Sequence, residues 1–156
     1  MSEALTLIDK IFKLKQEYED MKDMIDLKGP DSQEIDFQPM FYPDLLRIRK
    51  DLSCLSLDLA KSTGKYQRDF KNAEAKRKTQ YFIKKRECIQ IQKMKIGEAE
   101  TEAEVETSEL RISSATNEGL YSTGKLMLTQ CNEVLKSLNQ DISIIKKEYE
   151  SINNIQ

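Results

Sequence analysis

The sequence contains no histidine and no tryptophan, and only five glycines, three prolines and three cysteines among its 156 residues. The absence of histidine removes the usual ligand of zinc sites and the commonest general acid or base. The cysteines, Cys54, Cys88 and Cys131, are odd in number and far apart. They therefore form neither a CxxC metal pair nor a disulfide framework, and we expect a reducing compartment.

Long apolar runs are also absent, since none approaches the ~18 residues that a membrane helix needs. The N-terminal stretch MSEALTLIDK has no basic region followed by an apolar one, so we expect no secretory signal. We predict a soluble cytoplasmic protein with no membrane partner, no metal and no cofactor. Glutamate pairs such as Glu102 and Glu106 are more typical of a solvated helix surface than of a catalytic site, so we do not predict an enzyme.

The residues that are present favour long helices, because 33% of them are charged and 38% are hydrophobic. From residue 4 to residue 25 the apolar positions alternate in spacing between three and four, which predicts an amphipathic heptad helix over about 3–27, within an N-terminal region 1–28. A lone amphipathic helix is marginal in water, so its stripe needs a partner, on the same chain or on another subunit. The stripe residues assigned to packing or oligomerisation are Leu7, Ile11, Leu14, Tyr18, Met21 and Ile25.

Residues 29–42 show no such period and read as a linker, after which the stripe resumes over about 43–95 and again over 99–152. Gly97 lies between the two stretches, and glutamates open the second, which predicts a tight turn near 96–98. We therefore predict an all-α fold, in which residues 43–156 form a long antiparallel coiled-coil helical hairpin beside the additional N-terminal helix. The second stripe passes through Glu106 and Ser113, and its apolar end contributes the packing residues Leu135, Leu138, Ile142 and Ile145.

Positive and negative charges are concentrated on different stretches of the predicted hairpin. Residues 65–95 hold eleven Lys or Arg against three acids, a net charge of +8, whereas 98–118 hold seven Glu against one Arg, a net charge of −6. One interpretation is that these are facing, solvated flanks of a coiled coil whose charges set orientation. The other is that the basic helix follows a phosphate backbone, with Tyr81 and Phe82 available for base stacking, although the net charge of −2 argues against strong nonspecific DNA affinity. The candidate nucleic-acid-binding residues are Lys76, Arg77, Lys78, Lys84, Lys85, Arg86, Lys93 and Lys95.

The tetrapeptide STGK occurs twice, at 62–65 and at 122–125. A phosphate-binding loop requires a preceding strand and a Ser or Thr directly after the Lys, and neither copy meets this requirement. We interpret the two copies, around Gly64 and Gly124, as a patch of small residues that lets helices approach closely or permits a bend. The patch falls where the apolar base of the hairpin gives way to its charged half.

The segment KYQRDFKNAEAKRKTQYFIKKRE, the restart GEAETEAEVE and the ending EVLKSLNQDISIIKKEYE resemble, in this order, the phage recombination-mediator proteins of the UvsY type. The resemblance covers about residues 45–150 and excludes the N-terminal helix. It implies a non-enzymatic recombination or replication accessory protein, located in the host cytoplasm, that binds single-stranded DNA as a ring-shaped homo-oligomer. Its expected partners are a recombinase, which it helps to load, and a single-strand-binding protein.

Within this resemblance, the short basic motif of the family corresponds to Lys84, Lys85 and Arg86. The alternative function is a structural or scaffolding coiled-coil protein, such as a virion or assembly component, whose charges serve solubility and pairing without nucleic-acid binding.

Overall fold

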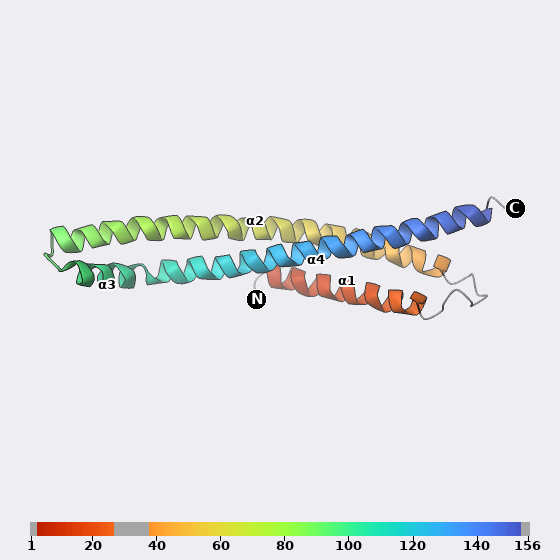
Figure 1. Cartoon of the computed structure of the whole chain (residues 1–156), viewed down its shortest axis with the longest axis horizontal. Coiled ribbons are helices and arrows are strands. Elements are labelled where there is room, and N and C mark those ends of the chain that lie inside the picture. Colours follow the sequence, from red (N-terminus) through yellow and green to blue (C-terminus); the bar gives the residue numbers. More distant parts are fainter. Residues whose placement is uncertain (1–2, 27–37, 154–156) are drawn as a thin grey trace. The chain divides into compact units, whose positions relative to one another are not determined.

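The computed structural model describes residues 3–26 and 38–153. These residues form four helices and contain no strand, so the predicted all-α class is confirmed. The helices are α1 (Glu3–Asp26), α2 (Gln38–Gln90), α3 (Ile96–Glu106) and α4 (Ser108–Asn153) (Figure 1). The chain divides into two compact units, unit 1 with residues 1–61 and 124–156 and unit 2 with residues 62–123.

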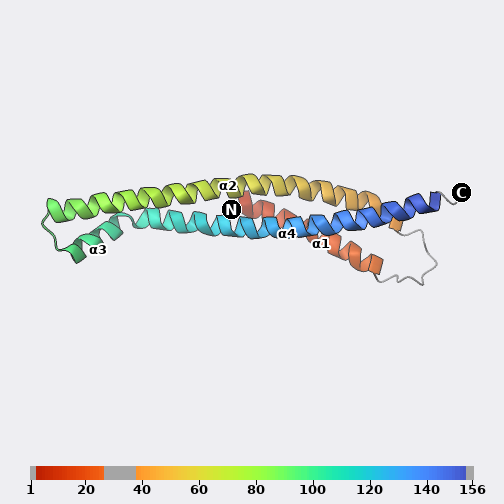
Figure 2. The same cartoon turned by 45° about the horizontal axis from the view of Figure 1, so that its top comes forward.

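Unit 1 is built from three helical segments, α1, the beginning of α2 and the end of α4. Figures 1 and 2 show α1 lying alongside α4 in both views. The Tyr18 hydroxyl donates a hydrogen bond to Asp141 Oδ2 at 2.5 Å and lies 2.7 Å from Ser137 Oγ, which ties α1 to α4. On the other side of α4, the Cys131 thiol approaches the carbonyl oxygen of Leu52 in α2 at 3.8 Å. Each helix of the unit therefore contributes to one shared core.

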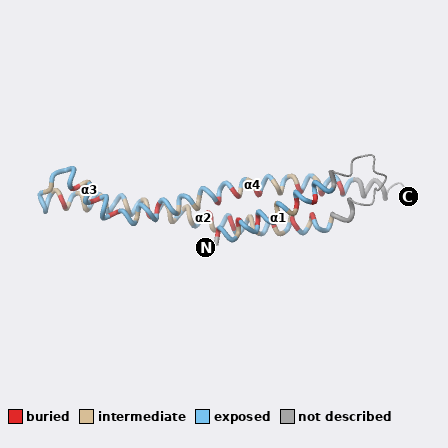
Figure 3. The backbone as a smooth tube through the Cα atoms, turned by 90° about the horizontal axis from the view of Figure 1, so that it is seen from below, coloured by how far each residue is buried: buried red, intermediate tan, exposed pale blue. Residues whose placement is uncertain are grey.

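Large aliphatic side chains make up most of this core. The tube in Figure 3, coloured by burial, has buried positions along all three segments. α1 begins at Glu3 and ends at Asp26, close to its predicted bounds. Its stripe follows the heptad only in part, because Ile8 is buried where the pattern predicts the half-buried Leu7. The side chain of Ile25 lies outside the described residues. The core members are Ala4, Ile8, Ile11, Tyr18, Met21, Leu45, Ile48, Leu52, Leu59, Met127, Cys131, Leu138, Ile142 and Ile145.

The predicted linker over 29–42 is wrong at its end, because α2 already includes residues 38–42. Residues 27–37, which hold the rest of the linker, lie outside the described part of the chain. Pro43 stands inside α2 rather than in its first turn. Helix formation thus extends further toward the N-terminus than the loss of a clear apolar period suggested.

Unit 2 pairs the second part of α2 with α3 and the beginning of α4, and small side chains dominate its core. The buried residues are Thr63, Ala73, Cys88, Ala99, Ala103, Thr107 and Ser114. The expected stripe through Glu106 and Ser113 is wrong, since both are exposed and the neighbouring Thr107 and Ser114 are buried instead.

The turn of unit 2 comes earlier than predicted. α2 ends at Gln90 and α3 begins at Ile96, so the turn occupies 91–95 rather than 96–98. Lys93 adopts the left-handed backbone conformation (φ 59°), and the N–H of Met94 donates to the carbonyl oxygen of Cys88 at 3.0 Å. Helices commonly end on a left-handed residue, usually glycine, so a lysine in this role is uncommon. Gly97 lies instead inside the first turn of α3.

Two helices replace the single predicted helix over 99–152, because α3 ends at Glu106 and α4 begins at Ser108. Thr107 alone separates the two helices. The Thr107 N–H donates to the carbonyl oxygen of Ala103 at 3.2 Å, and the Arg111 N–H donates to that of Thr107 at 3.1 Å. Each bond ends at Thr107 itself, and no i to i−4 bond between described residues joins α4 directly to α3, so the helical ladder is interrupted at this residue.

The borders between the two units fall between Lys61 and Ser62 and between Thr123 and Gly124. They therefore coincide with the two STGK copies. A Cβ atom added to Gly64 would meet no heavy atom within 4 Å, so the predicted close approach at this glycine is wrong.

Candidate nucleic-acid interface

The predicted basic residues lie on the second part of α2 and on the turn that follows it, all within unit 2. Between residues 65 and 90 the sequence has neither glycine nor proline and is rich in lysine, arginine, alanine and glutamine. These residues are strong helix formers, so an unbroken helix is expected there. The helix holds the cations at fixed intervals along its length.

Three of the predicted residues are neutralised by acids of the same unit. Lys85 Nζ lies 2.6 Å from Glu100 Oε1, Lys78 Nζ lies 2.8 Å from Glu74 Oε1, and Arg77 Nη1 lies 3.8 Å from Glu104 Oε1. The hydrogen bond to Glu100 raises the pKa of Lys85 above its ordinary value.

The bond from Lys78 lowers the pKa of Glu74 below its ordinary value. Glu100 and Glu104 of α3 and Glu74 of α2 therefore neutralise part of the basic charge.

The other five, Lys76, Lys84, Arg86, Lys93 and Lys95, make no ion pair within 4 Å in the described part of the chain. Lys84 is half-buried and the other four are exposed. Arg86 uses its Nε–H to bond Gln90 Oε1 at 3.0 Å, which leaves the rest of its guanidinium group open to a ligand. An anion could reach each of these five cations, called here the cationic cluster, without displacing a carboxylate, although Lys84 and Arg86 do not share a face of α2 because they are two residues apart.

Three further cations of α2, Lys65, Arg68 and Lys71, are also exposed and make no ion pair within the described residues. They belong to the basic run over 65–95 but are not among the predicted binding residues. Their positive charge and exposed positions on α2 mark them as further candidates for an anion.

Tyr81 and Phe82 lie within the basic run and differ in accessibility. Their rings pack edge to face with centroids 5.6 Å apart and planes at 80°. Tyr81 is half-buried, whereas 66% of Phe82 is exposed. Phe82 is therefore the aromatic ring of this region that offers a face to a base.

The residues assigned to packing or oligomerisation lie within unit 1 where the structure describes their side chains. Ile11, Tyr18, Met21, Leu138, Ile142 and Ile145 are buried in the core of unit 1, and Leu7, Leu14 and Leu135 are half-buried. They join α1 to α2 and α4 of the same chain. Of the two partners that the sequence left open for the first helix, the structure shows the same chain.

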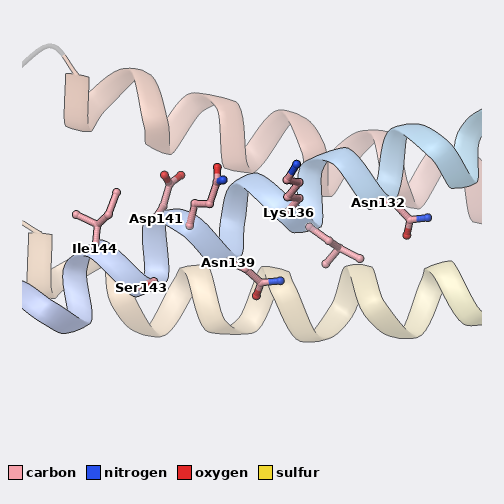
Figure 4. A pocket seen from close by; sticks show the side chains of 8 residues that line it. Asn132, Lys136, Asn139, Asp141, Ser143 and Ile144 are labelled. Atoms are coloured by element: carbon pink, nitrogen blue, oxygen red, sulfur yellow. The ribbon is translucent and has the colours of Figure 1, made fainter.

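Unit 1 also carries an open groove of about 780 Å³ along α4 (Figure 4). Figure 4 shows Lys136 and Asp141 directed toward α1 and Asn139 directed toward α2. The groove brings together amides, one lysine and one carboxylate that already accepts the Tyr18 hydrogen bond, with no nucleophile and base directed at a common point. Its lining residues are Asn132, Leu135, Lys136, Asn139, Gln140, Asp141, Ser143 and Ile144.

Across residues 3–26 and 38–153, no group of three or more His, Cys, Asp or Glu could hold a metal ion. None of the helices in these residues is both long and apolar enough to cross a membrane. No family model, no curated protein and no solved structure matches this chain.

Proposed function

We propose that the protein is a non-enzymatic accessory protein of phage-type recombination or replication that binds single-stranded DNA as a homo-oligomer in the host cytoplasm. The observation that carries the proposal is the cationic cluster of α2 and its turn, in which five predicted residues face no acid of the described chain. Cations that are not engaged with carboxylates release counterions when they bind phosphates, which is the main source of affinity for single strands.

Phe82 supports single strands over duplex as the ligand. Its ring is exposed beside the cluster, and unpaired bases stack on such rings without sequence preference. The resemblance to UvsY-type mediators adds the expected partners, a recombinase and a single-strand-binding protein, and a ring-shaped assembly.

A second candidate function, a structural coiled-coil protein, is favoured by the ion pairs Lys85–Glu100 and Arg77–Glu104. These pairs use charge to join α2 to α3 within the chain, as the solvated flanks of a coiled coil do. Unit 2 as a whole has a net charge of only +2, the difference between its twelve basic and ten acidic residues. On this alternative, single strands would not bind at all.

The experiment measures binding of a fluorescent oligothymidine by anisotropy between ~50 and ~300 mM salt. Two matched double variants are compared, Lys84→Ala with Lys95→Ala, which removes unpaired cations, and Lys78→Ala with Lys85→Ala, which removes paired ones. Because each phosphate contact contributes about 0.7 to the slope of log affinity against log salt, we expect the first variant to lower the slope by about 1.4. The second variant should change it less, since its lysines already face carboxylates.

Undetectable binding at ~50 mM salt would reject nucleic-acid binding and favour the structural alternative. Equal losses in the two variants would reject the assignment to unpaired cations, because both remove the same charge from the same unit. Circular dichroism of both variants checks that the helices remain intact.

A further inference from the structure

The outer face of α3 and α4 in unit 2 is uncharged and uncovered. Val105 and Ile112 are 63% and 67% exposed, and an added Cβ on Gly119 would meet no heavy atom within 4 Å. Within α4 the members of this face are all exposed and spaced by three or four, namely Ser108, Ile112, Ala115, Gly119 and Ser122, and Val105 is exposed near the end of α3, before the break at Thr107.

The spacing of this outer stripe is the heptad spacing of a helix that packs against another helix. Its residues are small or aliphatic, so a second helix could approach closely. Within the described residues of unit 2, the inner side of the same helices already packs on α2 through Ala99, Ala103 and Ser114. The outer stripe is thus a second helix-packing surface with no occupant in the chain.

The outer face of α2 in unit 2 has a matching composition. Ile83 is 62% exposed, and Lys76 and Arg86 lie seven residues before it and three residues after it, on the same side of the helix. Arg68 continues this side toward the N-terminus. None of these three cations makes an ion pair within 4 Å in the described part of the chain.

Charge complements the apolar contact. Glu102, Glu106 and Glu109 are exposed beside the outer stripe of α3 and α4, and they make no ion pair within the described residues. Pairing two α3–α4 faces would bring like acids together, and pairing two α2 faces would bring like cations together, both of which are unfavourable. Pairing one face of each kind brings acids to cations.

We infer that unit 2 docks on unit 2 of a second copy of this chain, with the outer face of α2 in one copy against the outer α3–α4 face of the next. The contact is heterologous, because it joins two different faces. In a pair of copies, one therefore keeps a free α3–α4 face and the other a free α2 face, and repetition closes a ring or extends a filament. The inference rests on the homo-oligomer of the proposed function and not on DNA binding. Of the cationic cluster, Lys76 and Arg86 lie on the α2 docking face, whereas Lys84, Lys93 and Lys95 are not part of either docking face and remain available to DNA in the assembly.

Complementation tests the inference on the full chain. Ile112→Glu should disable only the α3–α4 face and Ile83→Glu only the α2 face, because each places a carboxylate in the apolar contact. By light scattering at ~100 µM, each variant alone should be a monomer, whereas an equimolar mixture should form a 1:1 complex through the one intact pair of faces. Leu57→Glu, a change at a 64% exposed position in unit 1, is the matched control and should keep the wild-type mass.

Three results would overturn the inference. An Ile112→Glu variant with the wild-type mass would show that this face is not used, and a mixture without a 1:1 complex would reject the heterologous arrangement. A monomeric wild-type chain would reject both the inference and the homo-oligomer of the proposed function.

Loss of DNA binding can be measured separately from loss of docking between copies. Ile112→Glu changes no residue of α2, so anisotropy on this variant reports DNA binding separately from mass, whereas Ile83→Glu adds a carboxylate beside Arg86 and is used for mass alone. Unchanged helix content by circular dichroism separates loss of docking from loss of folding.

Discussion

The two units of the chain bury different kinds of side chain. Unit 1 encloses leucines, isoleucines, a tyrosine and methionines from three helical segments, whereas the core of unit 2 consists of alanines, a cysteine, two threonines and a serine. Full burial of one leucine or isoleucine contributes about 1.5–3 kcal/mol, and an alanine contributes much less. We therefore expect burial of apolar side chains to contribute much more to the free energy of folding in unit 1 than in unit 2.

The exposed residues complete the comparison. Each unit exposes six large hydrophobic residues in the described part of the chain, among them Phe82, Ile83 and Ile112 in unit 2, but only unit 1 also buries large ones. A unit without large buried side chains gains stability when a partner covers its exposed apolar residues. If unit 2 docks on a second copy as inferred above, assembly depends on unit 2, although the longest apolar stripes of the sequence belong to unit 1.

The largest expected effect comes from truncating the core of unit 1. Leu138→Ala should lower the free energy of unfolding by about 2–5 kcal/mol, because it leaves a cavity among well-packed helices. In unit 2, Ala103→Gly should cost only about 1 kcal/mol, mostly as helix propensity. Urea unfolding measures both values, with Leu57→Ala as an exposed control, and equal losses in the two units would contradict the comparison.

A smaller effect should separate the two buried cysteines, one in each unit. Cys88 in unit 2 and Cys131 in unit 1 are both buried, and Cys54 is exposed. Burial raises the pKa of the Cys131 thiol, which reduces its thiolate fraction. Labelling with a thiol reagent at pH ~8, followed by peptide mass spectrometry, should modify Cys54 first, then Cys88 and last Cys131.

The order of the buried pair tests the weaker core of unit 2, because each thiol reacts only when its unit opens. Labelling of Cys131 before Cys88 would show that unit 1 is the less stable unit. Cys54 serves as the internal control for reagent activity.

The smallest effect concerns the ion pair of Lys85 and Glu100 in unit 2. Since Glu100 raises the pKa of Lys85, the stabilisation is present below the ordinary lysine pKa and is lost as pH rises through the raised value. In an NMR titration of the lysine side chain, Glu100→Gln should move the pKa of Lys85 down toward its ordinary value. Glu102→Gln, which removes an unpaired acid, should leave it in place.

Much of the fold could be predicted from the sequence, because apolar spacing reports helix faces directly. The first helix, predicted over 3–27, ends at Asp26, and Tyr18 and Met21 are buried as predicted. The turn was misplaced because glycine was taken as its marker, whereas the chain reverses at the left-handed Lys93. The local bond from the Met94 N–H to the carbonyl oxygen of Cys88 closes this helix end, and a propensity argument assigns such a left-handed position to glycine.

The candidate site could be located but not resolved in detail. Spacing and charge place the basic run on one helix, yet they do not tell which cations meet an acid. Glu100 reaches Lys85 and Glu104 reaches Arg77 only because the turn at 91–95 sets the register between α2 and α3. The outer stripe through Ile112 escaped notice because the sequence carries two stripes on this stretch, and only packing shows which one is inside.

The hydrogen bond between Tyr18 and Asp141 joins residues 123 positions apart, whereas Lys85 and Glu100 are separated by 15. Contacts close in sequence form early, and distant ones wait for loop closure. During synthesis α1 can meet α2 through Glu17 and Arg47 well before the last helix leaves the ribosome, whereas its hydrogen bond to Asp141 waits for nearly the whole chain. The first helix to be made therefore completes its contacts last.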